Sequence, residues 1–441
     1  MWTDDYSRIR KRNIIITVVL VVLLAGVGVG MYFFSKQTQE EDAVLASVQT
    51  QQRTEQNEAR QEEIGAIQAE YEKDMETVAE YLPGIVCWGD SITAGSSGNI
   101  SYPYILQKYI DTYICDVYDF RLSIENAEDY SRLDWDQFKV DIPVVNMGAG
   151  QEDTNTILGR SGVVPYVVDG KFTIPADTSE VAIKLKSENG NPVAPLTGGS
   201  VGVNDVTVNG IKGTLSIDAN SYKQHSGTKY YFKRLEPGEE TVIEDGTPIV
   251  TAAADMYKNY IHVICVGTYG GFKSNINNKS GSIDTLVAQT KMMVERQTKN
   301  SDRYIVLGMC SYTGYWNGAY FNLDSYDSAM MQAFGNHYIN VRKYLVEDGL
   351  DDYRITPTNQ DVRDCKNCVV PESFRSTSGV SELNGKAYEL IGKLVYDRMD
   401  RLGYFDEVRD ELYIKESIKE IQKEDAQYFD RLLKSGTQLL K

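Results

Sequence analysis

A serine in a short turn flanked by glycines is the residue of this chain best placed for nucleophilic chemistry. Ser91 lies in the segment Gly-Asp-Ser-Ile-Thr-Ala-Gly, which follows the apolar run Ile85–Trp88 and leads into a helical pattern. A serine on such a turn is expected at the carboxyl edge of a sheet, where N–H groups of the next helix can stabilise an oxyanion. The turn also has a purely structural explanation, because Asp90 or Ser91 can cap those N–H groups.

With a strand before it and a helix after it, this turn resembles the first motif of the SGNH (GDSL-like) hydrolases. The resemblance covers about residues 84–403, apart from an insertion. It implies a flavodoxin-like three-layer α/β/α fold and an esterase or acyl hydrolase activity. In that family the serine is the nucleophile, and three further segments supply the oxyanion hole and the catalytic Asp and His.

The two segments that would complete the oxyanion hole are altered in this chain. The second segment of the family corresponds to Val144–Thr154, where the oxyanion glycine falls on Gln151, next to Gly150. A backbone N–H survives this change, but a turn that needs positive φ would not keep its shape. In the third segment Tyr269 replaces an asparagine, and its longer side chain would fill the acyl pocket.

The segment that would supply the catalytic Asp and His has neither. It reads Gly-Val-Ser-Glu-Leu-Asn, so that Gly379 and Glu382 stand at the two positions. Removing the base costs a serine hydrolase about 10⁴- to 10⁶-fold in turnover. An exposed carboxylate such as Glu382 is a weak base for a serine. We therefore interpret the site as a pseudoenzyme site that retains the nucleophile alone.

The three histidines of the chain lie outside these segments. They are His225, His262 and His337, and the last 104 residues contain none, since the chain ends at residue 441. We expect each of them to be a surface or structural histidine.

The elements that position Ser91 are predicted from short apolar runs that alternate with helical patterns. The runs are Ile85–Trp88, Val144–Val145, Ile261–Val266 and Tyr304–Leu307, and the helical patterns include Ile283–Gln297 and Gly385–Leu402. Buried parallel strands between helices explain this alternation, so the pattern predicts an α/β sandwich.

Residues 160–255 interrupt this pattern with alternating runs that are typical of antiparallel strands. The dipeptides Asn209-Gly210 and Asp245-Gly246 each separate two such runs, and both are strong hairpin signals. We therefore predict an inserted β module between two parts of the SGNH-like domain, residues 83–159 and 256–403. A C-terminal helical segment, residues 404–441, follows.

The N-terminal region carries an uncharged run of 21 residues, Ile14–Phe34. A helix of that length spans roughly 30 Å of hydrocarbon. Arg8, Arg10, Lys11 and Arg12 precede the run, which predicts a cytoplasmic tail over residues 1–13 and a single-pass anchor over residues 14–34. The alternative is a cleaved signal peptide, whose apolar region is usually shorter.

Residues 35–82 are predicted to form a helical stalk on the extracytoplasmic side. Its apolar positions recur at spacings of three and four: Ile64, Ile67, Tyr71, Met75, Val78 and Leu82. This stripe either pairs in a coiled coil, which would make the protein a homo-oligomer, or packs on the chain's own globular domain.

Composition and charge exclude several classes of protein. The chain is 42% hydrophobic and carries 63 acidic against 45 basic residues, a net charge of −18, so nucleic acid is not an expected partner. No cofactor fingerprint occurs. Cys365 and Cys368 form a C-x-x-C without a second ligand pair, so no metal site is predicted there, and the pair is either a local disulfide or two free thiols.

Three hypotheses of function follow. In the first, the protein binds a glycan or a cell-envelope protein at the outer face of a bacterial cell membrane without catalysis. In the second, it is an active serine esterase that deacylates O-acetylated polysaccharide, with Ser91 as nucleophile and a base from elsewhere. In the third, the terminal helical segments build an oligomeric stalk that carries the globular domain.

Overall fold

The computed structural model describes most of the chain, and all structural statements below concern the described residues. These are residues 3–95, 100–115, 141–150, 152–186, 205–217, 230–268, 279–296, 302–310, 315–316, 319–320, 323–376 and 382–411. The chain divides into two compact units, Met1–Lys73 and Asp74–Lys441, which are described separately.

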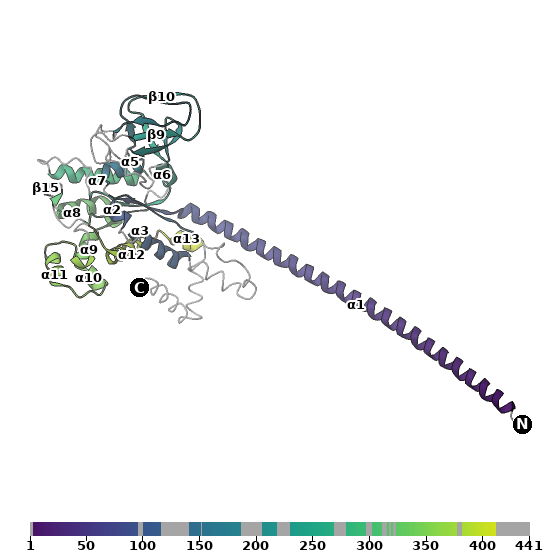
Figure 1. The fold of residues 1–441 in the computed structure, drawn as a ribbon. Helices are drawn as coiled ribbons and strands as arrows, with labels where there is room; N and C mark the ends of the chain where they lie inside the picture. The colour runs from purple at the N-terminus through teal and green to yellow at the C-terminus, as the bar shows by residue number, and fades with distance from the viewer. Residues whose placement is uncertain are drawn as a thin grey trace. The chain divides into compact units, whose positions relative to one another are not determined.

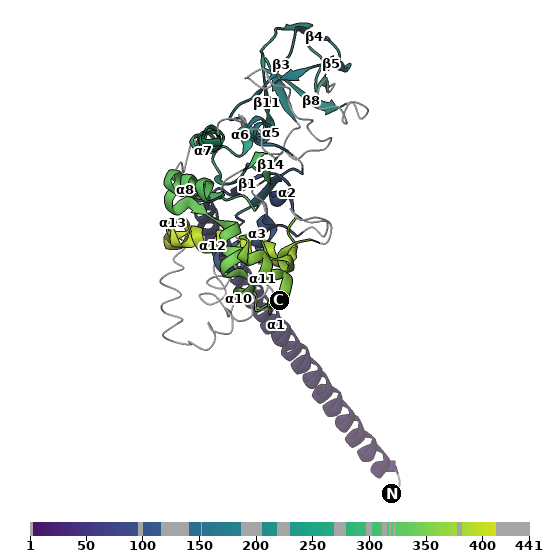
Figure 2. The ribbon, with the colours of Figure 1, turned by 90° about the vertical axis from the view of Figure 1, so that its left-hand side faces the viewer.

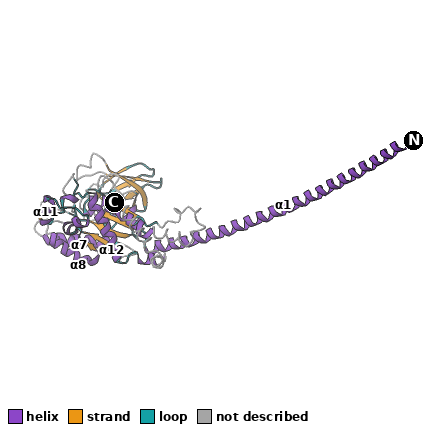
Figure 3. Ribbon diagram, turned by 90° about the horizontal axis from the view of Figure 1, so that it is seen from below, coloured by secondary structure: helices purple, strands orange, loops and turns teal. Residues whose placement is uncertain are grey.

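The first unit is made by most of helix α1, Thr3–Tyr81, which is one uninterrupted helix of 79 residues (Figure 3). The large apolar side chains between Ile14 and Phe34 are 49% to 76% exposed within the chain. By length and composition this part of α1 is able to cross a membrane. The predicted anchor and stalk are therefore parts of one helix.

The last turns of α1 belong to the second unit. Val78 and Leu82 are buried there, whereas the side chains of Ile64, Ile67 and Tyr71 lie outside the described residues. The end of the predicted apolar stripe thus packs within the chain's own globular unit.

A five-stranded parallel sheet forms the centre of the second unit (Figure 1). Its strands are β1 (Ile85–Gly89), β2 (Val144–Gly148), β12 (Ile261–Cys265), β13 (Tyr304–Leu307) and β16 (Tyr338–Ile339), in the spatial order β16-β13-β12-β1-β2. Every neighbouring pair is parallel. Numbered along the chain, the order is 2-1-3-4-5, so the direction of winding reverses beside the first strand.

Helices cover both faces of this sheet. On one face, Trp88 and other alternate strand residues pack in a common core with side chains of α5 (Thr154–Arg160), α7 (Lys279–Glu295) and α8 (Leu323–Phe334). On the other face lie α3 (Tyr102–Ile110) and α12 (Gly385–Arg401). A Cβ at Gly392 of α12 would lie 2.5 Å from Ile105, so the absence of a side chain lets the two helices approach closely. The predicted α/β architecture with a parallel sheet is confirmed.

Shorter elements complete the domain. They are α2 (Ser91–Ala94), α6 (Ala252–Met256), α9 (Val341–Glu347), α10 (Gly349–Asp352), α11 (Asn359–Lys366), α13 (Asp406–Glu411), the π turn Asp111–Cys115, the 3-10 turns Gly335–His337 and Glu372–Phe374, and the hairpin of β14 (Tyr315–Trp316) with β15 (Ala319–Tyr320). The rest of the predicted C-terminal helical segment, residues 412–441, lies outside the described residues.

Between α5 and α6 the chain forms an antiparallel β module with its own core (Figure 2). Seven of its strands make one sheet: β3 (Tyr166–Val168), β5 (Val181–Ile183), β6 (Leu185–Lys186), β7 (Val206–Val208), β8 (Ile211–Ile217), β9 (Tyr230–Arg234) and β11 (Pro248–Thr251). The edge strands β5 and β6 are consecutive in the chain, so the sheet nearly closes into a barrel.

One predicted hairpin of the module forms and the other does not. Asn209 and Gly210 both adopt positive φ, 47° and 79°, and connect β7 to β8 as an antiparallel pair. The hairpin predicted at Asp245-Gly246 is wrong, because β10 (Thr241–Ile243) pairs with β4 (Phe172–Ile174), whereas β11 pairs with β3 and β7.

The contacts of Asp245 explain the difference. Its carboxylate accepts hydrogen bonds from the Gly170 N–H and from Lys186 Nζ, both at 2.7 Å. Of the two turn residues only Gly246 has positive φ, 78°, so the turn lacks the conformation that keeps two strands of a hairpin paired. The chain instead crosses from one sheet to the other.

Candidate functional site

Ser91 is the first residue of the short helix α2, at the carboxyl edge of the parallel sheet. Asp90 caps this helix, since its carboxylate accepts a hydrogen bond of 2.9 Å from the Ile92 N–H. A Cβ at Gly89 would lie 2.0 Å from the Thr93 hydroxyl, which explains the glycine at the end of β1. In doubly wound sheets, ligands bind outside the carboxyl ends of the strands where the winding reverses, and Ser91 follows the strand at which this happens.

The end of β2 is fastened to this turn. Asn146 donates hydrogen bonds to the Ala94 carbonyl, at 3.4 Å, and to the Ser101 hydroxyl, at 3.3 Å. A Cβ at Gly148 would lie 2.1 Å from the Ala94 backbone nitrogen. The second segment of the predicted oxyanion hole is thus packed directly against the segment that carries Ser91.

Of the two predicted oxyanion positions after β2, the structure describes Gly150. Gly150 is exposed, is not among the residues with positive φ, and has open space where a Cβ would be. Gln151 lies outside the described residues, so its role stays a prediction.

A buried ion pair lies between the ends of β1 and β2. The Arg160 guanidinium is 2.7 Å from a carboxylate oxygen of Glu152, and both side chains are almost wholly buried. Arg160 also donates a hydrogen bond of 3.4 Å to the Gly89 carbonyl and lies over the Trp88 ring. The Thr251 hydroxyl, at the end of the β module, bonds to the Arg160 carbonyl at 2.6 Å. The module therefore begins and ends beside this ion pair.

Asp90 is a second buried carboxylate at the same edge. Burial raises its pKa to about 6, the Glu152 charge acts in the same direction, and the Ile92 N–H and the Thr268 hydroxyl act against it. The pKa of Glu152 is also raised by burial, which Arg160 opposes. Arg160 can balance only one of the two negative charges. Protonation of the other carboxylate removes the second charge.

The third predicted segment follows β12. Gly267 has φ of 108°, and a Cβ there would lie 2.9 Å from Leu286 and 3.0 Å from Met309. Thr268, next in the chain, faces Asp90. Tyr269 lies outside the described residues and stays a prediction for the oxyanion position.

The last predicted segment precedes α12. Glu382 is exposed, and its carbonyl accepts a hydrogen bond of 2.8 Å from the Ser376 N–H. Burial raises the pKa of Tyr388, and the Asp90 and Glu382 charges add to this effect. Gly379 lies outside the described residues.

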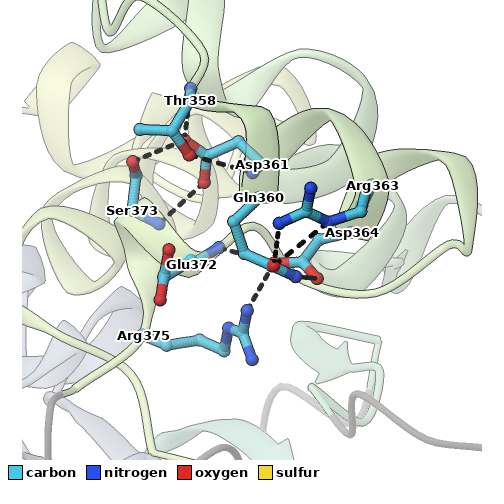
Figure 4. Close-up of polar contacts among 8 residues, drawn as sticks. All are labelled: Thr358, Gln360, Asp361, Arg363, Asp364, Glu372, Ser373 and Arg375. Carbon is cyan, nitrogen blue, oxygen red and sulfur yellow. Dashed lines mark hydrogen bonds and ion pairs between the residues drawn. The ribbon is translucent and has the colours of Figure 1, made fainter.

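A network on α11 holds the chain that leads to Glu382 (Figure 4). Asp361 accepts hydrogen bonds from the N–H and hydroxyl groups of both Thr358 and Ser373. Burial raises the pKa of Asp361, but these hydrogen bonds outweigh burial and lower it. Asp364 forms an ion pair with Arg375 and accepts the Glu372 N–H. These contacts fasten the segment before Glu382 to α11.

The two described histidines lie at the opposite edge of the sheet. His262 is the second residue of β12, pairs in register with Val86, and is 3.2 Å from the Tyr257 carbonyl. Gly89 is three residues further along the strand than Val86, a distance of about 10 Å at roughly 3.3 Å per residue. His337 precedes β16 and lies 3.0 Å from the carbonyl of Tyr304, the first residue of β13. His225 lies outside the described residues.

Sequence reasoning missed Asp90, Glu152 and Arg160 as parts of the site. The sequence predicts Asp90 only as a helix cap, and the pair at positions 152 and 160 has no distinctive spacing. Asp90 is a charge directly after an apolar run, whereas Glu152 stands between the polar residues Gln151 and Asp153, so its charge alone does not single it out. Among the described residues, no group of three or more His, Cys, Asp or Glu side chains is arranged to hold a metal ion.

Comparison with known protein families gave no match, and comparison with curated proteins gave none either.

Proposed function

We propose that this chain is a membrane-anchored protein whose SGNH-like domain binds a glycan at the outer face of a bacterial cell membrane and does not hydrolyse it. The observation that carries the proposal is the separation of Ser91 from both described histidines by the length of the parallel strands. General base catalysis needs a base within hydrogen-bond reach, about 3 Å, of the serine hydroxyl.

The fold supports the family resemblance. The strand order 2-1-3-4-5 is that of flavodoxin-like domains, and the Gly-Asp-Ser turn follows the strand at which the winding reverses. The SGNH family has its nucleophile at this position. The resemblance therefore has support from topology as well as from the first motif.

The other carboxylates do not replace the missing base well. Glu382 is exposed. Asp90 is buried, and its side chain caps the helix that Ser91 begins. Without a base, turnover falls by about 10⁴- to 10⁶-fold.

The apolar part of α1 supports the proposed location at the outer face of a membrane. The exposed apolar part of α1 follows Arg8, Arg10, Lys11 and Arg12, and the excess of basic residues there favours a cytoplasmic N-terminus. The globular unit then lies outside the cytoplasm, where cell-envelope glycans are present.

The first test is reactivity of the serine. The full chain in detergent is treated with a fluorophosphonate probe and with a generic acetyl ester, beside the Ser91→Ala variant and a control, Ser328→Ala, on the exposed face of α8. We expect the three folded proteins to show equal, background labelling and turnover. Labelling and turnover lost in Ser91→Ala alone would overturn the proposal in favour of a serine esterase.

The second test is binding. Gly150 is exposed with open space around its Cα, so Gly150→Trp places a bulky side chain at the carboxyl edge, and Gly65→Trp on α1 is the matched control. We expect the wild type and Gly65→Trp to bind O-acetylated envelope polysaccharide and Gly150→Trp to bind it at least 10-fold more weakly. Absence of polysaccharide binding, or capture of an envelope protein alone, would contradict a glycan-binding role.

A further inference from the structure

Two of the six cysteines differ from the rest in exposure. Cys87, Cys115, Cys265 and Cys310 are buried, whereas Cys365 is partly exposed and Cys368 is exposed. Burial raises the pKa of Cys87, Cys265 and Cys310, which keeps these thiols protonated and unreactive. An oxidant is therefore expected to react with Cys365 and Cys368.

The backbone brings these two cysteines together. Cys365 lies in the last turn of α11, and the Cys368 N–H donates a hydrogen bond of 3.0 Å to the Cys365 carbonyl. A four-residue turn of this kind holds its first and last Cα atoms within about 7 Å, which overlaps the usual disulfide range of about 4.4 to 6.8 Å. Cys368 adopts φ of 56°, which folds the chain back at the end of the helix.

We propose that Cys365 and Cys368 are a redox-modification site that closes into an intramolecular disulfide across the turn ending α11. The oxidant is a small disulfide such as oxidised glutathione, or a disulfide of a thiol-oxidising protein. This inference does not depend on what the sheet edge binds.

The reaction is an ordinary thiol–disulfide exchange. The thiolate of the more exposed Cys368 attacks one sulfur of the oxidant, forms a mixed disulfide and expels the first oxidant thiolate. The thiolate of Cys365 then attacks Cys368 Sγ and expels the second. The two cysteine thiols are oxidised, the oxidant is reduced to two thiols, and the two protons that the cysteines lose pass to the expelled thiolates.

The second step depends on pH. Burial raises the pKa of Cys365, and the nearby Asp361 and Asp364 carboxylates and the Cys368 thiol raise it further. Because the thiolate is the nucleophile, closure is expected to speed up as pH rises from neutral.

The disulfide would reinforce the segment that follows α11 and leads towards Glu382. The Cys368 carbonyl accepts a hydrogen bond of 3.1 Å from Arg342, and the Val369 N–H bonds to the Asp364 carbonyl at 2.9 Å. Asp364 in turn holds Glu372 and Arg375. A covalent link in this turn therefore limits fraying of the end of α11 and of the chain that it fastens.

The test uses the full chain in detergent, reduced and then freed of reductant. Native alkylation followed by peptide mass spectrometry is expected to modify Cys365 and Cys368 at least 10-fold faster than the four buried cysteines. After exposure to oxidised glutathione, the peptide that carries both cysteines should lose two hydrogens, and its alkylation should fall at least 10-fold. The melting temperature of the oxidised wild type should exceed that of the reduced protein.

The variants Cys365→Ser and Cys368→Ser are the controls. Each is expected to keep its remaining thiol open to alkylation or to a stable mixed disulfide, and to show no rise in melting temperature on oxidation. A wild type that stops at a mixed disulfide on Cys368, that forms an intermolecular dimer, or that stays reduced would overturn the proposal.

Discussion

The two edges of the parallel sheet use polar residues in different ways. At the amino edge, His337 stacks on Tyr304 with ring centroids 4.2 Å apart and lies 2.8 Å from the Tyr404 hydroxyl. The Tyr404 hydroxyl also receives the Tyr304 N–H at 3.0 Å. At the carboxyl edge, by contrast, there are two buried carboxylates, Asp90 and Glu152, and Glu152 is paired with the buried guanidinium of Arg160.

This difference distinguishes the polar residues with a structural role from those of the candidate functional site. Polar groups at the amino edge bond to backbone groups and to each other, which is how a strand start is usually stabilised. The carboxyl edge holds excess buried negative charge beside Ser91, an arrangement that costs folding free energy and is typical of functional sites. The histidines of this sheet are thus at the structural edge, and Ser91 is at the edge where doubly wound sheets bind ligands.

The largest loss of stability is expected when the buried ion pair at the carboxyl edge is broken. Arg160→Met leaves the Glu152 carboxylate buried without its cation, which should lower the free energy of unfolding by about 3 to 5 kcal/mol. Denaturant unfolding of the full chain in detergent, followed by circular dichroism, measures this. The control is Lys171→Met, which removes an exposed pair with Glu244 and should cost less than about 1 kcal/mol. Equal losses in the two variants would contradict the importance given to Arg160.

The amino edge should be destabilised by acid through His262. Burial lowers the pKa of His262 from 6.5 to about 4, the Arg296 charge acts in the same direction, and the Tyr257 carbonyl opposes it. Because the unfolded chain binds the proton first, stability is complete above pH 6.5 and falls as pH drops toward 4, by about 3 kcal/mol. His262→Leu should remove this part of the pH dependence. Parallel stability curves for the two proteins between pH 4 and 7 would rule the effect out.

The carboxyl edge should respond to pH in the opposite sense through Asp90. Its pKa is raised from 3.8 to about 6, so the folded state binds the proton more tightly than the unfolded state does. Stability is then complete below pH 3.8 and is lost as pH rises through 6, by about 3 kcal/mol. Asp90→Asn keeps an oxygen that can cap α2 and should be the more stable protein above pH 6. A wild type that gains stability over Asp90→Asn as pH rises would contradict the assignment.

Much of the fold could be predicted from the sequence because strands and turns leave local signals. The run Tyr304–Leu307 is a strand with the predicted bounds, and Asn209-Gly210 forms the predicted hairpin. Asp245-Gly246 carries the same signal but not the same structure, since tertiary contacts of Asp245 decide which strands pair. A dipeptide specifies a turn, and the surrounding sheet specifies the partner of each strand.

The candidate site was less predictable for a related reason. The position of Ser91 follows from a strand, a glycine and a helix start, all of which are local in sequence. The burial of Asp90 and Glu152, and the pairing of Glu152 with Arg160, arise only in the folded chain, so the pKa shifts of the two carboxylates could not be predicted from their neighbours in the sequence. The roles of Gln151, Tyr269 and Gly379 stay predictions.

The smallest loss of stability is expected for His337→Phe, which tests the structural role of the amino edge. His337→Phe keeps an aromatic ring to stack on Tyr304 but loses the polar contacts with the Tyr304 carbonyl and the Tyr404 hydroxyl. The Tyr404 hydroxyl retains its bond to the Tyr304 carbonyl at 2.9 Å, so the loss should be limited to about 1 kcal/mol. The measurement is denaturant unfolding, paired with fluorophosphonate labelling of the same samples. Because His337 acts at the amino edge alone, labelling should equal that of the wild type. A change in labelling without a change in stability would connect the two edges and would make His337 part of the chemistry of Ser91.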